Sequence, residues 1–113
     1  MIPKILAIVS EEENFRLLHQ QLSIAFSGDV VIQRLHSVLE ISSVGSEGIN
    51  FVFTDVFLPH TGKIPELQLL RVQFCYLPII AITTQTELAV HLNAIKNGVQ
   101  DVVVWGTMDA LSL

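Results

Sequence analysis

The chain has 113 residues, of which 50% are hydrophobic and 15% charged, and its formal net charge is −5. This length accommodates one domain with one core. The acidic balance and the lack of a Lys/Arg cluster argue against a nucleic-acid surface or a polybasic membrane patch. The single cysteine excludes an internal disulfide framework and a cysteine-rich zinc site, and it favours a reduced, cytoplasmic compartment.

The first apolar run, Ile5–Val9, is continuous and predicts a strand that is buried on both faces of a sheet. It is too short for a membrane helix, and it lacks a signal-peptide cleavage pattern. Ser10 and Glu13 then match the S-x-x-E capping box that begins a helix. The apolar face of this helix is predicted from residues at helical spacing: Phe15, Leu18, Leu22 and Phe26.

Two more strands are predicted in the middle of the chain, Val30–Leu35 and Asn50–Thr54. Between them, Ser37–Val44 predicts a short helix that ends at Gly45. The second of these strands runs directly into Asp55, which therefore lies at a strand end.

The C-terminal half continues the alternation of helices and strands. Pro65 suits the first turn of a helix. Pro78–Thr83 and Asp101–Trp105 are predicted strands, and Asn97-Gly98 is typical of a helix C-terminus. The helix after Pro65 has an apolar face formed by Leu67, Leu70 and Phe74.

The helix before Asn97 is predicted to begin at a second capping box, formed by Thr84 and Glu87. Its apolar residues at helical spacing are Leu88, Leu92 and Ile95.

Five strands that alternate with helices predict an α/β fold with a parallel sheet and right-handed crossovers. In such sheets, binding sites lie beyond the carboxyl ends of the strands. We therefore expect four segments to converge: Ser10–Glu12, Asp55–Phe57, Thr83–Thr84 and Trp105–Gly106.

The side chains in these segments predict an acyl-phosphate site. A carboxylate at a strand end, such as Asp55, can attack a phosphoryl donor if a cation offsets the charge repulsion. A divalent ion such as Mg²⁺ needs several oxygen ligands, which Glu11, Asp55 and the Phe57 carbonyl can supply. The Thr83 hydroxyl can donate to the phosphoryl oxygens.

Three segments resemble the receiver domains of response regulators. Asp55-Val-Phe-Leu-Pro59 resembles the D-x-x-[LM]-P phosphoacceptor segment, and Pro78-Ile-Ile-Ala-Ile-Thr83 resembles the strand that bears the switch hydroxyl. Ala94-Ile-Lys-Asn-Gly98-Val-Gln-Asp101 resembles the A-x-x-x-G-A-x-D stretch before the last strand. The resemblance runs in order from Pro3 to about Gly106.

The resemblance implies a single domain with a flavodoxin-like, doubly wound five-stranded parallel sheet in the order 2-1-3-4-5. It also implies a non-enzymatic role in two-component, phosphorelay signalling, with Asp55 as the phosphoacceptor and Thr83 as the switch hydroxyl. The implied partner is a sensor histidine kinase or a phosphotransfer protein.

The chain departs from the receiver pattern at three places. Ser10-Glu11 occupies the position of two adjacent acidic residues, which predicts a weakened Mg²⁺ site. The lysine of the K-P dipeptide aligns with Trp105, whose indole N–H carries no charge. The aromatic switch position aligns with Val102. These departures predict an atypical receiver whose phosphoryl switching is unconventional.

Receiver domains end with a full helix, whereas Thr107–Leu113 provides fewer than two turns. The last helix is therefore predicted to be short or missing, which leaves a strip beside the fifth strand uncovered. Either the chain is a fragment of a longer protein, with an attached output domain, or a partner covers the strip. A homodimer through this strand would place Trp105 and Val103 at its interface.

Two alternatives remain. One is a pseudo-receiver, an interaction or dimerisation module that is not phosphorylated and binds no metal. The other is a flavodoxin-like binder of a small ligand. The second is disfavoured because Ser-Glu-Glu-Glu, rather than a glycine-rich loop, follows the first strand and would repel phosphates.

Overall fold

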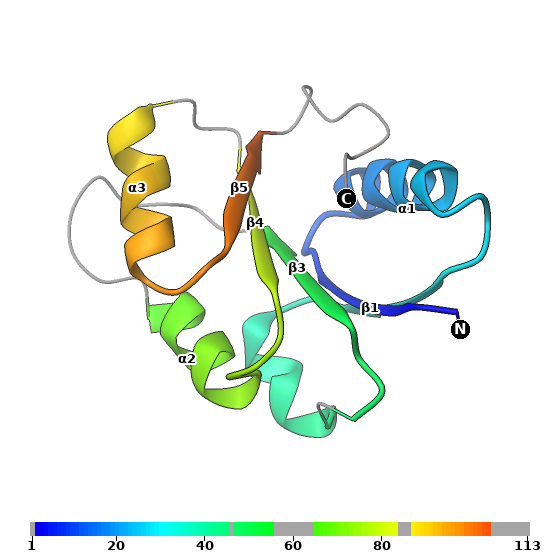
Figure 1. The fold of residues 1–113 in the computed structure, drawn as a ribbon, viewed down its shortest axis with the longest axis horizontal. Helices are drawn as coiled ribbons and strands as arrows, with labels where there is room; N and C mark the ends of the chain where they lie inside the picture. The colour runs from blue at the N-terminus through cyan, green and yellow to red at the C-terminus, as the bar shows by residue number, and fades with distance from the viewer. Residues whose placement is uncertain (1, 46, 56–64, 84–86, 105–113) are drawn as a thin grey trace.

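Five parallel strands form one sheet with helices on both of its faces (Figure 1). The computed structural model describes residues 2–45, 47–55, 65–83 and 87–104. The strands are β1 (Lys4–Ile8), β2 (Val31–Leu35), β3 (Phe51–Asp55), β4 (Ile79–Thr83) and β5 (Asp101–Val104). The helices are α1 (Glu12–Ala25), the 3-10 helix η1 (Val38–Ser43), α2 (Pro65–Gln73) and α3 (Leu88–Lys96).

The strand order is β2-β1-β3-β4-β5, and every neighbouring pair is parallel. This confirms the predicted flavodoxin-like, doubly wound arrangement. The predicted strands are also confirmed, each with ends within one residue of the prediction in the described ranges. The segment 107–113, where the last helix is predicted to be short or missing, lies outside the described residues.

Burial on both faces explains why the strands are continuous apolar runs. All of β4 and residues Ile5–Ile8 of β1 are buried. One face of the sheet packs against α1 through Leu18 and Leu22, and the other packs against η1, α2 and α3 (Figure 1). Each large apolar side chain that is fully buried contributes about 1.5–3 kcal/mol. The two-sided core therefore holds the strand ends in a defined order.

The structure confirms the predicted apolar faces of α1 and α2. Phe15 and Phe26 pack at the margin of the core beside the buried leucines of α1. The predicted face of α2 is buried, with exposures of 1% or less: Leu67, Leu70 and Phe74. None of the helices in the described ranges combines the length and apolar character needed to cross a membrane.

The predicted capping boxes are wrong in their positions. Helix α1 begins at Glu12 with Glu11 as its N-cap residue, one position after the predicted Ser10. The reason lies in the tertiary structure, because Ser10 donates to a carboxylate on another strand instead. Helix α3 begins at Leu88 with Glu87 as its N-cap residue, and Thr84 lies outside the described residues.

Helix α3 buries a different face from the one predicted. Leu88, Leu92 and Ile95 are 69%, 55% and 45% exposed, whereas Val90 and Ala94 are buried. Val90 and Ala94 are four residues apart and share a face. Two apolar stripes therefore run along this helix, and their spacing does not indicate which one faces the core.

Arg71 ties the end of α2 to two strands. Its guanidinium donates to the carbonyl oxygens of Cys75 at 3.1 Å and Leu77 at 3.0 Å, and to Oε1 of Gln100 at 3.2 Å. The same Gln100 oxygen accepts the N–H of Ile79 at 2.6 Å. This network joins the C-terminal end of α2 to the starts of β4 and β5.

Gly98, which follows α3, packs against Arg71 at a φ of +110°, and a Cβ there would lie 3.2 Å from Cγ of Arg71. We expect Gly98→Ala to lower the free energy of unfolding by about 1–3 kcal/mol, because the backbone is strained for an L-residue and Arg71 must move. Urea unfolding followed by circular dichroism measures the loss. Gly45→Ala is the control, since a Cβ at Gly45 would meet no described atom within 4 Å. Equal losses in the two variants would contradict this account.

Candidate functional site

Three neighbouring strands carry predicted site residues at one edge of the sheet. Asp55 is the last residue of β3 and pairs with Ile82, so Thr83 lies one position beyond it on β4. On the other side, the pairing of β1 with β3 places Ser10 one position beyond Asp55. Because the strands are parallel, their carboxyl ends meet here, as predicted.

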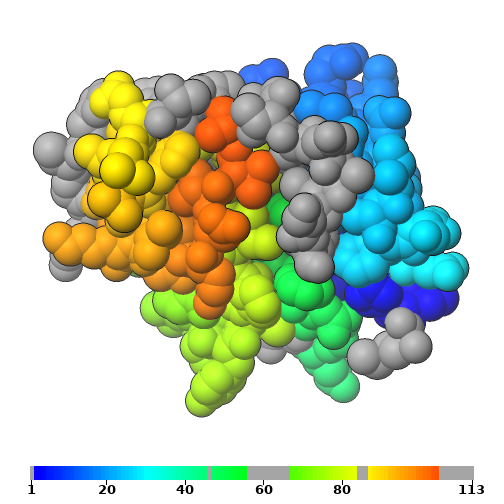
Figure 2. Space-filling view, turned by 45° about the horizontal axis from the view of Figure 1, so that its top comes forward, coloured from blue at the N-terminus to red at the C-terminus, as the bar shows by residue number. Residues whose placement is uncertain are grey.

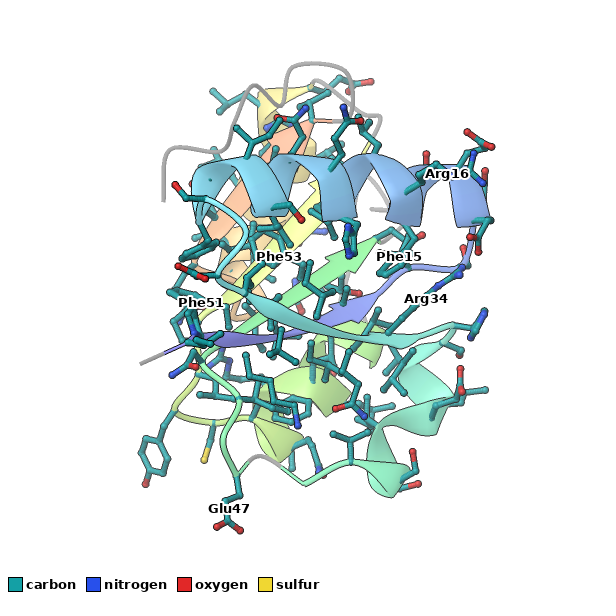
Figure 3. The ribbon with its side chains drawn as sticks, turned by 90° about the vertical axis from the view of Figure 1, so that its right-hand side faces the viewer. Phe15, Arg16, Arg34, Glu47, Phe51 and Phe53 are labelled. Atoms are coloured by element: carbon teal, nitrogen blue, oxygen red, sulfur yellow. The ribbon has the colours of Figure 1, made fainter. Side chains whose placement is uncertain are left out.

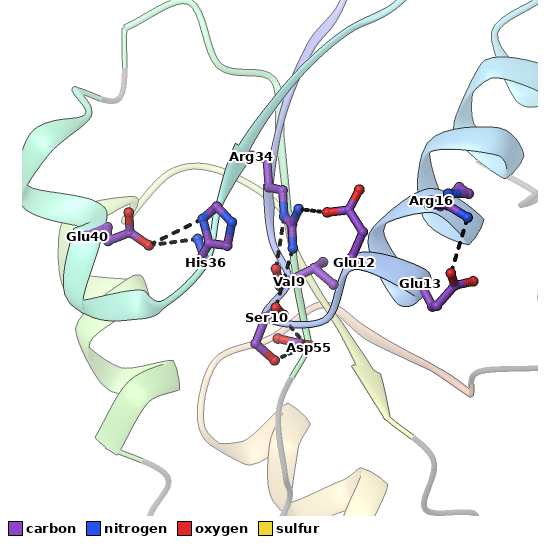
Figure 4. Close-up of polar contacts among 9 residues, drawn as sticks. All are labelled: Val9, Ser10, Glu12, Glu13, Arg16, Arg34, His36, Glu40 and Asp55. Atoms are coloured by element: carbon purple, nitrogen blue, oxygen red, sulfur yellow. Dashed lines mark hydrogen bonds and ion pairs between the residues drawn. The ribbon is translucent and has the colours of Figure 1, made fainter.

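The Asp55 carboxylate is held by Ser10. Oδ2 of Asp55 accepts the backbone N–H of Ser10 at 3.1 Å and the Ser10 hydroxyl at 3.1 Å (Figure 4). Hydrogen bonds to an ionised acceptor are stronger than bonds between neutral groups. Because Asp55 is half-buried, its charge loses part of its hydration, and these two hydrogen bonds offset part of that loss.

Arg34 of β2 contacts the turn between β1 and α1 at three points. Its Nε donates to the carbonyl oxygen of Val9 at 3.2 Å, and a terminal nitrogen lies 3.4 Å from the carbonyl oxygen of Ser10. Its other terminal nitrogen pairs with the Glu12 carboxylate (Figure 4). The guanidinium therefore fixes the backbone on both sides of Ser10.

The surroundings of Arg34 favour a fixed position for its side chain, which is 15% exposed. The guanidinium carbon lies 4.8 Å from the centre of the Phe15 ring on α1 (Figure 3). A cation over an aromatic face gains about 0.5–2 kcal/mol, the more so when it is shielded from water. Arg34 thus joins β2, the turn after β1 and the first turns of α1.

The run of three glutamates is divided among different roles. Glu12 pairs with Arg34, and Glu13 pairs with Arg16 at 3.2 Å on the exposed surface of α1. Glu11 is exposed and is the N-cap residue of α1. Among the described residues, Glu11 is the one of these three carboxylates that does not pair with an arginine, and its role as a metal ligand stays a prediction.

Arg34 is a site residue that the sequence patterns do not single out. It is one of the two polar residues in β2, a segment for which the pattern predicts a strand and no more. An arginine near the carboxyl end of a predicted strand, in a chain with three acidic residues after the neighbouring strand, is a signal of charge pairing at that edge. This signal can be used only when β1 and β2 are known to be neighbours in the sheet.

The remaining predicted residues are placed less completely. Thr83 is 2% exposed at the end of β4. Val103 of β5 is half-buried and packs against the core face that α1 covers. Phe57 and Trp105 lie outside the described residues.

The side chains at the carboxyl ends of these strands provide only some of the oxygen ligands that a divalent cation needs. Among the described residues, no three His, Cys, Asp or Glu side chains are grouped as a metal site. Where a second carboxylate would add ligand oxygens, Ser10 instead donates two hydrogen bonds to Asp55. The predicted carbonyl ligand, at Phe57, falls outside the described ranges.

Receiver domains of known structure have the same fold as this chain. A response-regulator receiver domain protein from Clostridium thermocellum matches with a TM-score of 0.74 and 21% identity, over 96% of this chain and 85% of that one. A candidate pilus assembly-related protein from Burkholderia pseudomallei matches with a TM-score of 0.76 and 18% identity, over 96% and 81% of the two chains.

A third match is the receiver domain of Saccharomyces cerevisiae Ssk1, crystallised with the histidine phosphotransfer protein Ypd1. Its TM-score is 0.71 at 16% identity, over 92% of this chain and 79% of that one. No protein-family model and no curated protein sequence matches the chain. The comparisons therefore establish a receiver fold at low sequence identity.

We expect Arg34→Ala to lower the free energy of unfolding by about 1–3 kcal/mol, because it removes bonds to two carbonyl oxygens and the contact with Phe15. Urea unfolding followed by tryptophan fluorescence measures this loss. The control is Arg16→Ala, which removes an ion pair between side chains that are 66% and 80% exposed and should cost about 0–1 kcal/mol. Similar losses in both variants would show that Arg34 has no special structural role.

Proposed function

We propose that this chain is a receiver domain of two-component signalling in which Asp55 accepts a phosphoryl group. The observation that carries the proposal is the position of Asp55. It ends the central strand of a receiver fold, with Thr83 one position further along the next strand. The output is regulation by protein contact, which agrees with a non-enzymatic signalling module.

In the proposed reaction, a carboxylate oxygen of Asp55 forms a bond to phosphorus. The bond between phosphorus and the donor nitrogen of a phosphohistidine breaks, and its electron pair stays with the imidazole. The Thr83 hydroxyl then donates to a phosphoryl oxygen. Glu11, Asp55 and the Phe57 carbonyl would hold Mg²⁺, whose charge offsets the repulsion between the carboxylate and the donor.

The proposed phosphoryl donor is a sensor histidine kinase or a phosphotransfer protein in the cytoplasm. The structural likeness to a receiver domain that was crystallised with a phosphotransfer protein supports this type of partner. Tryptophan at position 105, where receivers carry lysine, removes a positive charge from the proposed site. We therefore propose that phosphorylation here is slower than in a conventional receiver.

We expect the intact protein to gain the mass of one phosphoryl group when it is incubated with acetyl phosphate and Mg²⁺, and Asp55→Asn to gain none. The variant should gain no mass because an amide side chain cannot form the acyl phosphate. Intact-mass spectrometry measures the gain in each protein. Asp29→Asn is the matched control, since Asp29 is exposed in the turn before β2, at the opposite edge of the sheet. Equal phosphorylation of Asp55→Asn and the unmodified chain would refute the role of Asp55.

The second candidate function is a pseudo-receiver that acts by contact without phosphorylation. The observation that favours it is the pair of hydrogen bonds from Ser10 to Oδ2 of Asp55, which satisfies this oxygen without a metal. The experiment with acetyl phosphate separates the two functions. A chain that gains no phosphoryl mass in the presence of Mg²⁺ is a pseudo-receiver.

For both functions we propose that the output surface is formed by β5 and α3, and that it binds a second copy of the chain. The two elements lie side by side at the surface (Figure 2). The exposed apolar stripe of α3, Leu88, Leu92 and Ile95, supports this surface, since charged residues are depleted at the centres of interfaces. Trp105 and Val103 are the proposed anchors on the strand side, with Val103 on the face of the sheet opposite to the one that α3 covers.

We expect the chain to be a dimer in sedimentation equilibrium, and Leu92→Glu and Trp105→Ala each to weaken the dimer at least about tenfold, as loss of an interface anchor does. The control is Val72→Glu, because Val72 is 79% exposed on α2, a different helix. A chain that is monomeric at all concentrations, or a dimer that Val72→Glu weakens equally, would refute this surface.

A further inference from the structure

We propose that Ser10 and Arg34 form a clasp that holds Asp55 in its resting state and competes with a cation for Oδ2. Ser10 holds the carboxylate directly, and Arg34 is a positioning residue that acts through Ser10. This inference rests on the proposed function of the Asp55 site, because it concerns how that site is regulated.

Oδ2 of Asp55 already accepts two hydrogen bonds. A carboxylate offers about four acceptor sites on its two oxygens. At Asp55, the backbone N–H and the hydroxyl of Ser10 both reach the same oxygen, each at 3.1 Å. A cation that takes Oδ2 as a ligand must therefore displace at least one of these two donors.

The position of Ser10 is fixed by contacts of the turn after β1 with β2. The carbonyl oxygens of Val9 and Ser10 both accept from the guanidinium of Arg34, at 3.2 and 3.4 Å. In addition, the N–H of Val9 donates to the carbonyl oxygen of Leu35 at 3.0 Å. The turn after β1 is thus attached to β2 on one side, while the amide and hydroxyl of Ser10 lie toward Asp55 on the other (Figure 4).

An arginine suits position 34 because a guanidinium can make all of these contacts at the same time. One guanidinium bonds the two carbonyls and the Glu12 carboxylate at the same time, and its face lies over Phe15. A planar group with five N–H donors can make these contacts together, whereas a lysine ammonium is a point charge without this shape. The ion pair with Glu12 adds a further anchor that keeps the Arg34 guanidinium beside the turn.

The experiment measures the Mg²⁺ dissociation constant by NMR shifts of backbone amides, without any phosphoryl donor. We expect Ser10→Ala to bind Mg²⁺ about two- to tenfold more tightly than the unmodified chain, the change that corresponds to one net hydrogen bond. Ser10→Asp, which adds a carboxylate, should bind more tightly still. Unchanged or weaker binding by Ser10→Ala would overturn the clasp, whatever Ser10→Asp does.

A double-mutant cycle tests the role of Arg34. Arg34→Ala should tighten Mg²⁺ binding about two- to tenfold in the unmodified chain and leave it unchanged in Ser10→Ala. Arg16→Ala, at an exposed arginine of the same acidic segment, should change neither. Additive effects of the Arg34 and Ser10 substitutions would refute positioning through Ser10. Arg34→Lys, which keeps the positive charge but lacks the planar set of five donors, replaces Arg34→Ala if that variant does not fold.

The inference and the proposed function fail in different measurements. If Mg²⁺ binding follows the expected pattern but no variant gains phosphoryl mass at Asp55, the clasp stands and the phosphoacceptor role fails. If Asp55 is phosphorylated while Ser10→Ala binds Mg²⁺ no more tightly, the receiver function stands and the clasp fails.

Discussion

The parallel pairing of β1 with both β2 and β3 is the constraint on which the site depends. Because β1 is buried on both faces and bonded along both edges, its carboxyl end cannot shift without breaking two ladders. The turn that follows is therefore held in one place. Arg34 reaches it from β2 and Asp55 reaches it from β3, and both contact Ser10. Three strands that are distant in sequence thus meet at a single residue.

The hydrogen bonds from Ser10 offset the partial burial of the Asp55 charge. A half-buried carboxylate requires hydrogen-bond donors or a cation to offset lost hydration. At Asp55, Ser10 supplies neutral donors to the carboxylate, while the nearby positive charge of Arg34 is directed to Glu12 and to carbonyl oxygens. Oδ2 of Asp55 is therefore satisfied by groups of the chain itself.

Packing of α3 determines which of its apolar side chains remain exposed. The core accepts the smaller stripe, Val90 and Ala94, whereas the larger stripe, with Leu92 at its centre, stays exposed. Short side chains let a helix lie close to the sheet, and this geometry leaves the bulkier residues outside. A chain that is half hydrophobic thereby keeps an apolar surface available for contact.

The sequence by itself determined the fold, because continuous apolar runs that alternate with helical patterns fit a parallel sheet buried on both faces. It also predicted Asp55 and Thr83 at the carboxyl end of the sheet, since parallel strands bring their carboxyl ends together. Only the tertiary structure decided that Ser10 bonds to Asp55 rather than capping α1, and that Arg34 braces the turn. Capping is a local pattern, whereas these contacts join residues 24 and 45 positions apart, which local spacing does not encode.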